Sequence, residues 1–153
     1  MKNNLFFVAS EQRVARVVAS KVAVFFDMRL FDSVEMFEFD HSPRKIDEVA
    51  CEFGEEYVKK EMKSIAKMQL DFDDALFVAD IKYLDSLKDL HCSIQQKNLV
   101  IFLNNKNINL DKLAKIEFLR DCCDLAIDVT NLSDEQCFEN VVNEIKAFYK
   151  IEV

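Results

Sequence analysis

Short, continuously apolar runs alternate along this chain with longer stretches whose apolar residues recur at helical spacing. Such runs are typical of strands buried on both faces, because a strand with one solvent face alternates apolar and polar residues. The runs are Leu5–Ala9, Val24–Phe26, Ala75–Ala79, Leu99–Leu103 and Leu125–Val129. Strands that alternate with helices predict an α/β fold of three layers, αβα, with a parallel sheet and right-handed crossovers.

Apolar stripes and capping signals place helices between these runs. The valines of residues 14–22 recur at helical spacing, and Ser42 with Pro43 predicts a helix start with serine as the N-cap. Gly54 breaks the helical stretch that follows into two parts. Further helices are expected at 83–90, at about 111–120, and after the capping box Ser133–Gln136.

Length and charge limit the organisation and the partners. The 153 residues contain no repeat and no Gly/Ser/Pro linker, so we expect a single domain over 1–153. The net charge of −8 opposes binding to nucleic acid or to an anionic membrane surface. No apolar run approaches the roughly 20 residues that cross a bilayer. We expect a cytoplasmic protein with no nucleic-acid and no membrane partner.

The cysteines agree with a cytoplasmic location. They are odd in number, lack C-x-x-C spacing, and are expected to be reduced, mostly buried thiols and not zinc ligands. The vicinal pair Cys122–Cys123 is expected to be buried. His91 and Cys92 could form a base and nucleophile, but we do not expect sequence neighbours to face each other.

The chain contains one glycine, Gly54, where average usage would give roughly eleven. The Walker loop, the dinucleotide-binding fingerprint and the nucleophile elbow each need at least two glycines within a few residues. None of these motifs is present in standard form.

Three passages nevertheless follow the order of a known family. Residues 16–27 (RVVASKVAVFFD) suit a helix and a strand ending at an aspartate, and residues 46–59 (IDEVACEFGEEYVK) place a Gly-Glu pair after a helix. Residues 123–133 (CDLAIDVTNLS) suit a last strand and a helix cap. Together these passages resemble the shikimate kinase family of small P-loop kinases over nearly the whole chain. The resemblance implies a five-stranded parallel sheet in the order 2-3-1-4-5.

The positions that this family uses for nucleotide depart from its pattern. Its glycine-rich phosphate loop would fall on Ser10, Glu11, Gln12 and Arg13, and this passage is several residues shorter. Glu11 stands near the position of the phosphate-binding lysine, so a repulsive charge replaces an attractive one. The family's lid has no counterpart between Asn104 and Leu119, and Lys115 or Ile116 falls where an arginine precedes the last strand. The resemblance therefore implies a degenerate member that lacks the phosphate loop and the lid.

The substrate positions also depart, and we treat them as vestigial candidates. Asp27 matches the first aspartate of the family's Asp-x-Asp, whereas Arg29 replaces the second. Lys59 takes the place of a carboxylate-binding arginine and loses its bidentate fork. Asp80 lies in Ala79-Asp80-Ile81, which replaces a triple-glycine turn.

Other groupings of charged residues have both a functional and a plain interpretation. The inferred strand order brings Ser10, Glu11, Asp27, Asp80 and Asn104 to the carboxyl edge of the sheet, where ligands of open α/β folds bind. There Asp27 and Asp80 could hold a divalent cation, although carboxylates at strand ends more often face water. Asp71, Asp73 and Asp74 precede a strand and are expected to form a solvated loop. Five cations could form a residual anion site, but ordinary paired surface residues are the favoured interpretation. They are Arg13, Arg16, Arg29, Arg44 and Lys59.

These observations lead to two hypotheses of function. The first is a catalytically inactive shikimate-kinase-like protein with no cofactor, no metal ligand and no catalytic residue, which serves as a binding or regulatory module for a protein partner or as a homodimer. The alternative is an active or residual shikimate kinase, or another small-molecule kinase, with a nonstandard site for ATP and Mg²⁺. A cleft filled by Phe31 or Phe37 would favour the module, and Phe39 belongs to the same aromatic, acidic segment. An open pocket lined by Asp27, Arg29, Lys59 and Asp80 would favour the kinase.

Overall fold

A five-stranded parallel sheet forms the centre of the computed structural model, which describes residues 2–108, 118–119 and 122–152. The order β2-β3-β1-β4-β5 confirms the prediction. The strands are β1 (Asn4–Ala9), β2 (Arg29–Asp32), β3 (Ala75–Val78), β4 (Asn98–Asn104) and β5 (Leu125–Asp128). The helices are α1 (Gln12–Phe25), α2 (Ser33–Asp40), α3 (Ile46–Phe53), α4 (Glu55–Gln69), the 3-10 helix η1 (Ile81–Leu90), α5 (His91–Lys97) and α7 (Asp134–Glu152).

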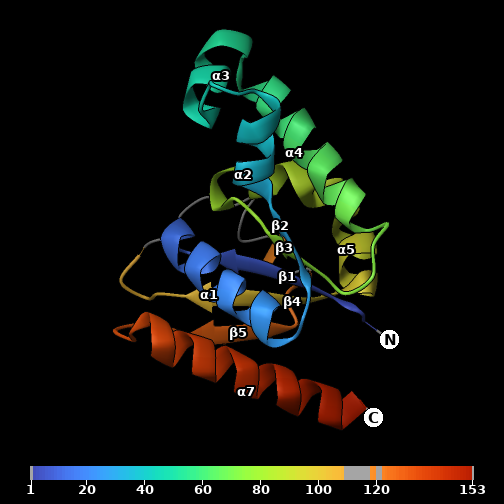
Figure 1. Ribbon diagram of the computed structural model, residues 1–153, viewed down its shortest axis with the longest axis vertical. Helices are drawn as coiled ribbons and strands as arrows, with labels where there is room; N and C mark the ends of the chain where they lie inside the picture. The colour runs from blue at the N-terminus through green and yellow to red at the C-terminus, as the bar shows by residue number, and fades with distance from the viewer. Residues whose placement is uncertain (1, 109–117, 120–121, 153) are drawn as a thin grey trace.

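Helices cover both faces of the sheet and complete the three-layer αβα architecture (Figure 1). One core lies between the sheet and the pair α1 and α7, whose buried valines, alanines and isoleucine face it. A second core lies between the other face and the helices α2, α3, α4, η1 and α5. Strand β1 is buried along its whole length between the two cores, as its unbroken apolar run predicts. No helix among the described residues has the length and apolarity needed to cross a membrane.

The prediction of a strand at Val24–Phe26 is wrong, because these residues end α1 and the turn after it. The buried positions of α1 recur at helical spacing as far as Ala23, and the chain leaves the helix at Asp27, where φ is 54°. Val24 is 83% exposed and Phe25 is 50% exposed, so this apolar run does not enter the sheet. Strand β2 begins at Arg29 instead. Three apolar residues are too few for periodicity to separate a strand from a helix end.

The capping predictions have mixed outcomes. Ser42 and Pro43 lie in the turn between α2 and α3 and do not begin a helix, because α2 already ends at Asp40 and α3 starts at Ile46. The capping box of the last helix is confirmed by hydrogen bonds in both directions between Ser133 and Gln136. The expected helix at 111–120 and the region compared with the family's lid fall largely outside the described residues.

Gly54 separates α3 from α4 with φ 92° and ψ 158°, a conformation almost restricted to glycine. A Cβ atom at this position would meet no atom within 4 Å, so the cost of a side chain is conformational and not steric. We expect Gly54→Ala to lower the free energy of unfolding by about 2 kcal/mol. Urea denaturation measures this effect, with Lys60→Ala as the control on the exposed surface of α4. Equal stability of the two variants would contradict the assignment.

Candidate functional site

The carboxyl ends of parallel strands meet at one edge of the sheet, where ligands of open α/β folds bind. The structure places Ser10 after β1, Asp32 at the end of β2, Asp80 after β3 and Asn104 at the end of β4. These polar residues make up the carboxyl edge, and the positions of Ser10, Asp80 and Asn104 are as expected. Asp32 was not among the predicted site residues.

Two of the predicted substrate residues lie at the opposite edge. Asp27 precedes β2 and Arg29 begins it, where Arg29 pairs in register with Ala75, the first residue of β3. Their expected place depended on a strand at residues 24–26, which the structure replaces by the end of α1. The prediction of a possible cation site between Asp27 and Asp80 is therefore wrong. Asp27 lies before β2 at the amino edge, whereas Asp80 lies after β3 at the carboxyl edge. Asp71, Asp73 and Asp74 are exposed at the amino edge, as expected.

Lys59 and Asp80 are each engaged within the fold. The Lys59 ammonium lies 3.4 Å from the Asp85 carboxylate of η1 and 3.7 Å from Glu56, and Asp85 raises the pKa of Lys59. The Asp80 carboxylate accepts a hydrogen bond from the Lys82 amide at 3.0 Å and caps η1. The sequence-predicted substrate residues Asp27, Arg29, Lys59 and Asp80 thus do not form one site.

The connection from β1 to α1 consists of two residues, Ser10 and Glu11. The Ser10 hydroxyl accepts a hydrogen bond from the Asn105 amide at 2.8 Å, and the Ser10 amide donates to Leu103 at 3.1 Å. Both contacts tie the turn to the end of β4. The side-chain oxygen Oε1 of Gln12 accepts a hydrogen bond from the Ile81 amide at 3.3 Å. This turn therefore bonds to neighbouring strands and helices of its own chain.

Arg13, in the first turn of α1, pairs mainly with Asp134 at the start of α7. Its guanidinium contacts both carboxylate oxygens of Asp134, at 3.0 and 3.3 Å, and lies 3.6 Å from Glu11. The guanidinium holds the pKa of Asp134 below its usual range, through its hydrogen bond first. The four residues predicted from the family's phosphate loop, Ser10 to Arg13, are contiguous in the structure. The charge of Arg13, however, is already paired with Asp134 and Glu11.

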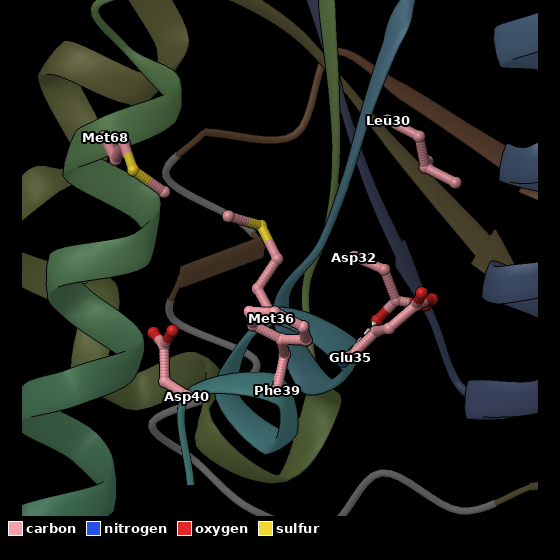
Figure 2. A pocket seen from close by; sticks show the side chains of 7 residues that line it. All are labelled: Leu30, Asp32, Glu35, Met36, Phe39, Asp40 and Met68. Carbon is pink, nitrogen blue, oxygen red and sulfur yellow. Dashed lines mark hydrogen bonds between the residues drawn. The ribbon is translucent and has the colours of Figure 1, made fainter. Parts of the chain in front are cut away.

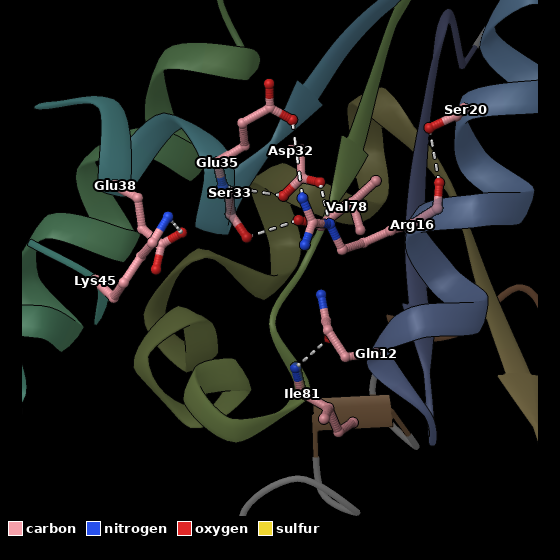
Figure 3. A network of polar contacts seen from close by, with 10 residues as sticks. All are labelled: Gln12, Arg16, Ser20, Asp32, Ser33, Glu35, Glu38, Lys45, Val78 and Ile81. Carbon is pink, nitrogen blue, oxygen red and sulfur yellow. Dashed lines mark hydrogen bonds and ion pairs between the residues drawn. The ribbon is translucent and has the colours of Figure 1, made fainter. Parts of the chain in front are cut away.

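A polar network joins α1 to the ends of β2 and β3 (Figure 3). The Arg16 guanidinium donates from Nε to Asp32 Oδ2 at 2.7 Å, and Asp32 Oδ1 accepts from the Glu35 amide at 3.2 Å. The Ser33 hydroxyl donates to the Val78 carbonyl at 2.7 Å. Both oxygens of the Asp32 carboxylate, which is 7% exposed, are therefore used within the chain.

Beside β3, mostly apolar side chains close the carboxyl edge. A cavity of about 10 Å³ lies among residues that include Ser33, Phe77, Asp80 and Tyr83. That volume is about the minimum that holds one water molecule. Tyr83 is 3% exposed, and burial, with Glu55 as the next cause, raises its pKa.

The aromatic residues expected to fill a cleft divide between core and surface. Phe31 and Phe37 are buried in the core beneath α2, α3 and α4, where Phe31 packs on Phe72 and Phe37 stacks on His41 at 4.2 Å between ring centroids. Phe39 is 82% exposed. The two buried rings belong to the packing of the fold beside the carboxyl edge, whereas Phe39 is available to solvent.

Replacement of Asp32 tests whether its carboxylate stabilises the fold or is kept for binding a ligand. Removal of a ligand-binding group commonly leaves a fold equally or more stable, because such groups are held for function at some cost in stability. Here we expect Asp32→Ala to lower the free energy of unfolding by about 2 kcal/mol, since it removes the N-cap of α2 and the partner of Arg16. Thermal and urea unfolding measure it, with the exposed Asp40→Ala as the control. A gain in stability would indicate a ligand site.

The cysteine and histidine expectations have mixed outcomes. The five cysteines are free, as expected, and Cys122 is buried, with burial raising the pKa of Cys123. Cys123 is only half-buried, and Cys51 and Cys92 are exposed, so the expectation of buried cysteines is met in part. His91 and Cys92 do face each other, contrary to expectation. His91 Nε2 lies 3.3 Å from the Cys92 sulfur, while Nδ1 lies 2.8 Å from the Lys88 carbonyl. The contact of Nδ1 with the Lys88 carbonyl holds the His91 ring beside its neighbour, which linear spacing does not reveal.

The cations and carboxylates do not gather into a further site. Arg44 pairs with Glu52 at 3.1 Å, and Arg29 lies over the Phe72 ring at the amino edge. With Arg13, Arg16 and Lys59 paired as described above, the structure does not bring these five cations together. Within the described ranges, no three His, Cys, Asp or Glu side chains are arranged to hold a metal ion.

Solved structures resemble this chain closely in fold and remotely in sequence. Shikimate kinase from Acinetobacter baumannii in complex with shikimate matches with a TM-score of 0.73 and 10% identity, over 96% of this chain and 94% of that one. Shikimate kinase from Aquifex aeolicus matches at 0.68 with 11% identity, over 95% and 98%. The enzyme from Bacteroides thetaiotaomicron matches at 0.65 with 12% identity, over 96% and 98%. No family model and no curated protein matches the sequence. The chain has a shikimate-kinase-like P-loop fold.

Proposed function

We propose that this chain is a catalytically inactive shikimate-kinase-like protein that serves as a binding or regulatory module for another protein. Phosphoryl transfer depends almost wholly on positioning and on stabilisation of charge, so an enzyme of this fold needs free polar groups at the carboxyl edge. The observation that carries the proposal is that three of the polar groups at this edge are engaged within the chain. Asp32, Arg16 and Ser10 all bond to their own fold.

The turn between β1 and α1 supports the same conclusion for nucleotide. A Walker loop places several residues, with glycines and a lysine, between the strand and the helix, so that backbone amides surround the phosphates. Two residues connect β1 to α1 here, and one of them is Glu11. The carboxylate repels a phosphate at the helix start, where the backbone alone would attract it.

The space beside β3 supports the absence of a small-molecule substrate at that strand. The cavity of about 10 Å³ at its carboxyl end leaves no room for a sugar-sized ring. Met62, Phe77 and Leu87 line it together with Tyr83. Opening it would separate α4 and η1 from the sheet.

Binding of ATP tests the proposal without any assumption about a substrate. A ligand at a hundred times its Kd stabilises a fold by about 2.7 kcal/mol, which raises the melting temperature by several degrees. We expect the full chain to show neither binding heat nor a shift in melting temperature with ATP and Mg²⁺ up to several millimolar. Saturable binding that Glu11→Ala strengthens would support the alternative, a kinase with a nonstandard nucleotide site.

A further inference from the structure

An apolar groove lies along the edge strand β2 between α2 and α4, and it borders the carboxyl-edge network at Asp32 and Glu35 (Figure 2). Its volume is about 410 Å³, which is within the range of about 300–1,000 Å³ typical of ligand pockets. Met36 of α2 and Met68 of α4 extend toward one another across it. The lining residues are Leu30, Asp32, Glu35, Met36, Phe39, Asp40 and Met68.

The apolar part of the groove is unusually exposed. Phe39 is 82% exposed, and Leu30 and Met68 are each nearly two-fifths exposed. Exposed apolar residues that cluster in a groove with a polar rim mark interaction sites more often than isolated ones do. Methionine side chains adapt to differently shaped apolar groups, which suits a surface that binds a peptide segment.

The charge of the groove indicates which kind of peptide segment it would bind. Each of its three charged lining residues, Asp32, Glu35 and Asp40, is acidic, and none is basic. Arg16 neutralises Asp32 at 2.7 Å, but Glu35 lies 3.9 Å from Arg16 and is 72% exposed. In the part of the chain that the structure describes, no ion pair involves Asp40.

The end of α2 adds to this negative potential. The carbonyl end of a helix carries a partial negative charge, which a basic residue in the last turn commonly offsets. The last turn of α2 has no basic residue and carries Asp40 instead. The adjacent Phe39 ring offers its face to a cation. A lysine or arginine that approaches this end would meet the Asp40 carboxylate beside the Phe39 ring.

We infer that this groove binds a basic segment of another protein, with an apolar side chain between Met36 and Met68 and a flanking lysine or arginine beside Asp40. The inference rests on the proposed function, because it names the partner of the module. A second copy of this chain is a poorer occupant. The chain carries a net charge of −8, so two acidic rims would repel each other.

The methionines provide the direct measurement. The full chain labelled with ¹³C at the methionine methyl groups is titrated with a synthetic amphipathic peptide of leucine and lysine, and with its leucine–glutamate counterpart. We expect saturable shifts of the Met36 and Met68 signals with the lysine peptide, and no shifts of Met62 and Met28, which lie outside the groove. The glutamate peptide should leave all of them unchanged. Signals are assigned with the single Met→Leu variants.

Matched variants separate the groove from general attraction between opposite charges. We expect Phe39→Ala and Asp40→Lys each to weaken binding of the lysine peptide by about tenfold. The controls Val24→Ala, which removes an exposed apolar side chain of α1, and Glu139→Lys, on the exposed surface of α7, should change it less than twofold.

Several results would overturn the inference. They are equal binding of both peptides, equal effects of groove and control variants, and unchanged Met36 and Met68 signals. Light scattering that shows a dimer, which Phe39→Ala converts to a monomer, would assign the groove to a second copy. These results concern the groove alone and leave the proposed inactivity unchanged. ATP turnover would instead overturn the proposed function and leave the peptide data intact.

Discussion

Phe37→Ala should lower the free energy of unfolding by about 4 kcal/mol, the usual cost of deleting a fully buried phenylalanine. Phe37 has no exposed surface and stacks on His41, which in turn contacts the Tyr57 hydroxyl at 2.6 Å. Loss of the ring leaves a cavity where α2 meets α3 and α4. For a chain of this size the melting temperature should fall by about 10 °C.

Phe39→Ala is the matched control, because it removes the same ring from the same helix two residues later. Since Phe39 is 82% exposed, its replacement should change the free energy of unfolding by less than about 0.5 kcal/mol. Urea denaturation of the two variants beside the parent chain gives both values. Equal losses would contradict the orientation of α2, and with it the assignment of Phe39 to the groove.

Gln69→Ala should cost about 3 kcal/mol, because it breaks a buried amide network at the amino edge. Gln69 donates from Nε2 to Asn98 Oδ1 at 2.8 Å and to the Ala75 carbonyl at 3.2 Å. Asn98 has no exposed surface, and within the described residues both the oxygen and the nitrogen of its side chain hydrogen-bond to Gln69. The variant leaves this amide buried without a partner.

Asn4 completes the network from β1. Its carbonyl oxygen accepts from the Ala75 amide at 3.0 Å, and its amide donates to the Phe72 carbonyl at 2.8 Å. Lys67→Ala, on the exposed side of the same turn of α4, is the control and should be nearly neutral. A loss below about 1 kcal/mol for Gln69→Ala would indicate that water or a shifted side chain replaces the missing amide.

The sequence predicted most accurately those strands that are buried on both faces. The runs at 5–9 and 99–103 lie within β1 and β4, because central strands are continuously apolar. Strand β2 was misplaced because it is an edge strand that begins with the exposed residues Arg29 and Leu30. Its apolar signal is weaker than that of Val24–Phe26, whose exposure no local pattern reveals.

The error in β2 carried over to the site. Residues placed from β1 and β3, such as Ser10 and Asp80, lie at the carboxyl edge as expected, whereas Asp27 and Arg29 do not. Asp32 could have been found from local sequence, because an aspartate followed three residues later by Glu35 is a helix-start signal. Its pairing with Arg16 could not, since that contact depends on how α1 crosses the sheet.

Phosphoryl transfer is the most direct test of the proposed inactivity. The full chain is incubated with ATP, Mg²⁺ and shikimate in an assay coupled to ADP release. Kinases commonly turn over at about 1–100 s⁻¹. We predict no ADP release above that of a sample without the chain, and no difference between the parent chain and Asp32→Asn. Turnover that is proportional to the concentration of the chain and is abolished by Asp32→Asn would contradict the account.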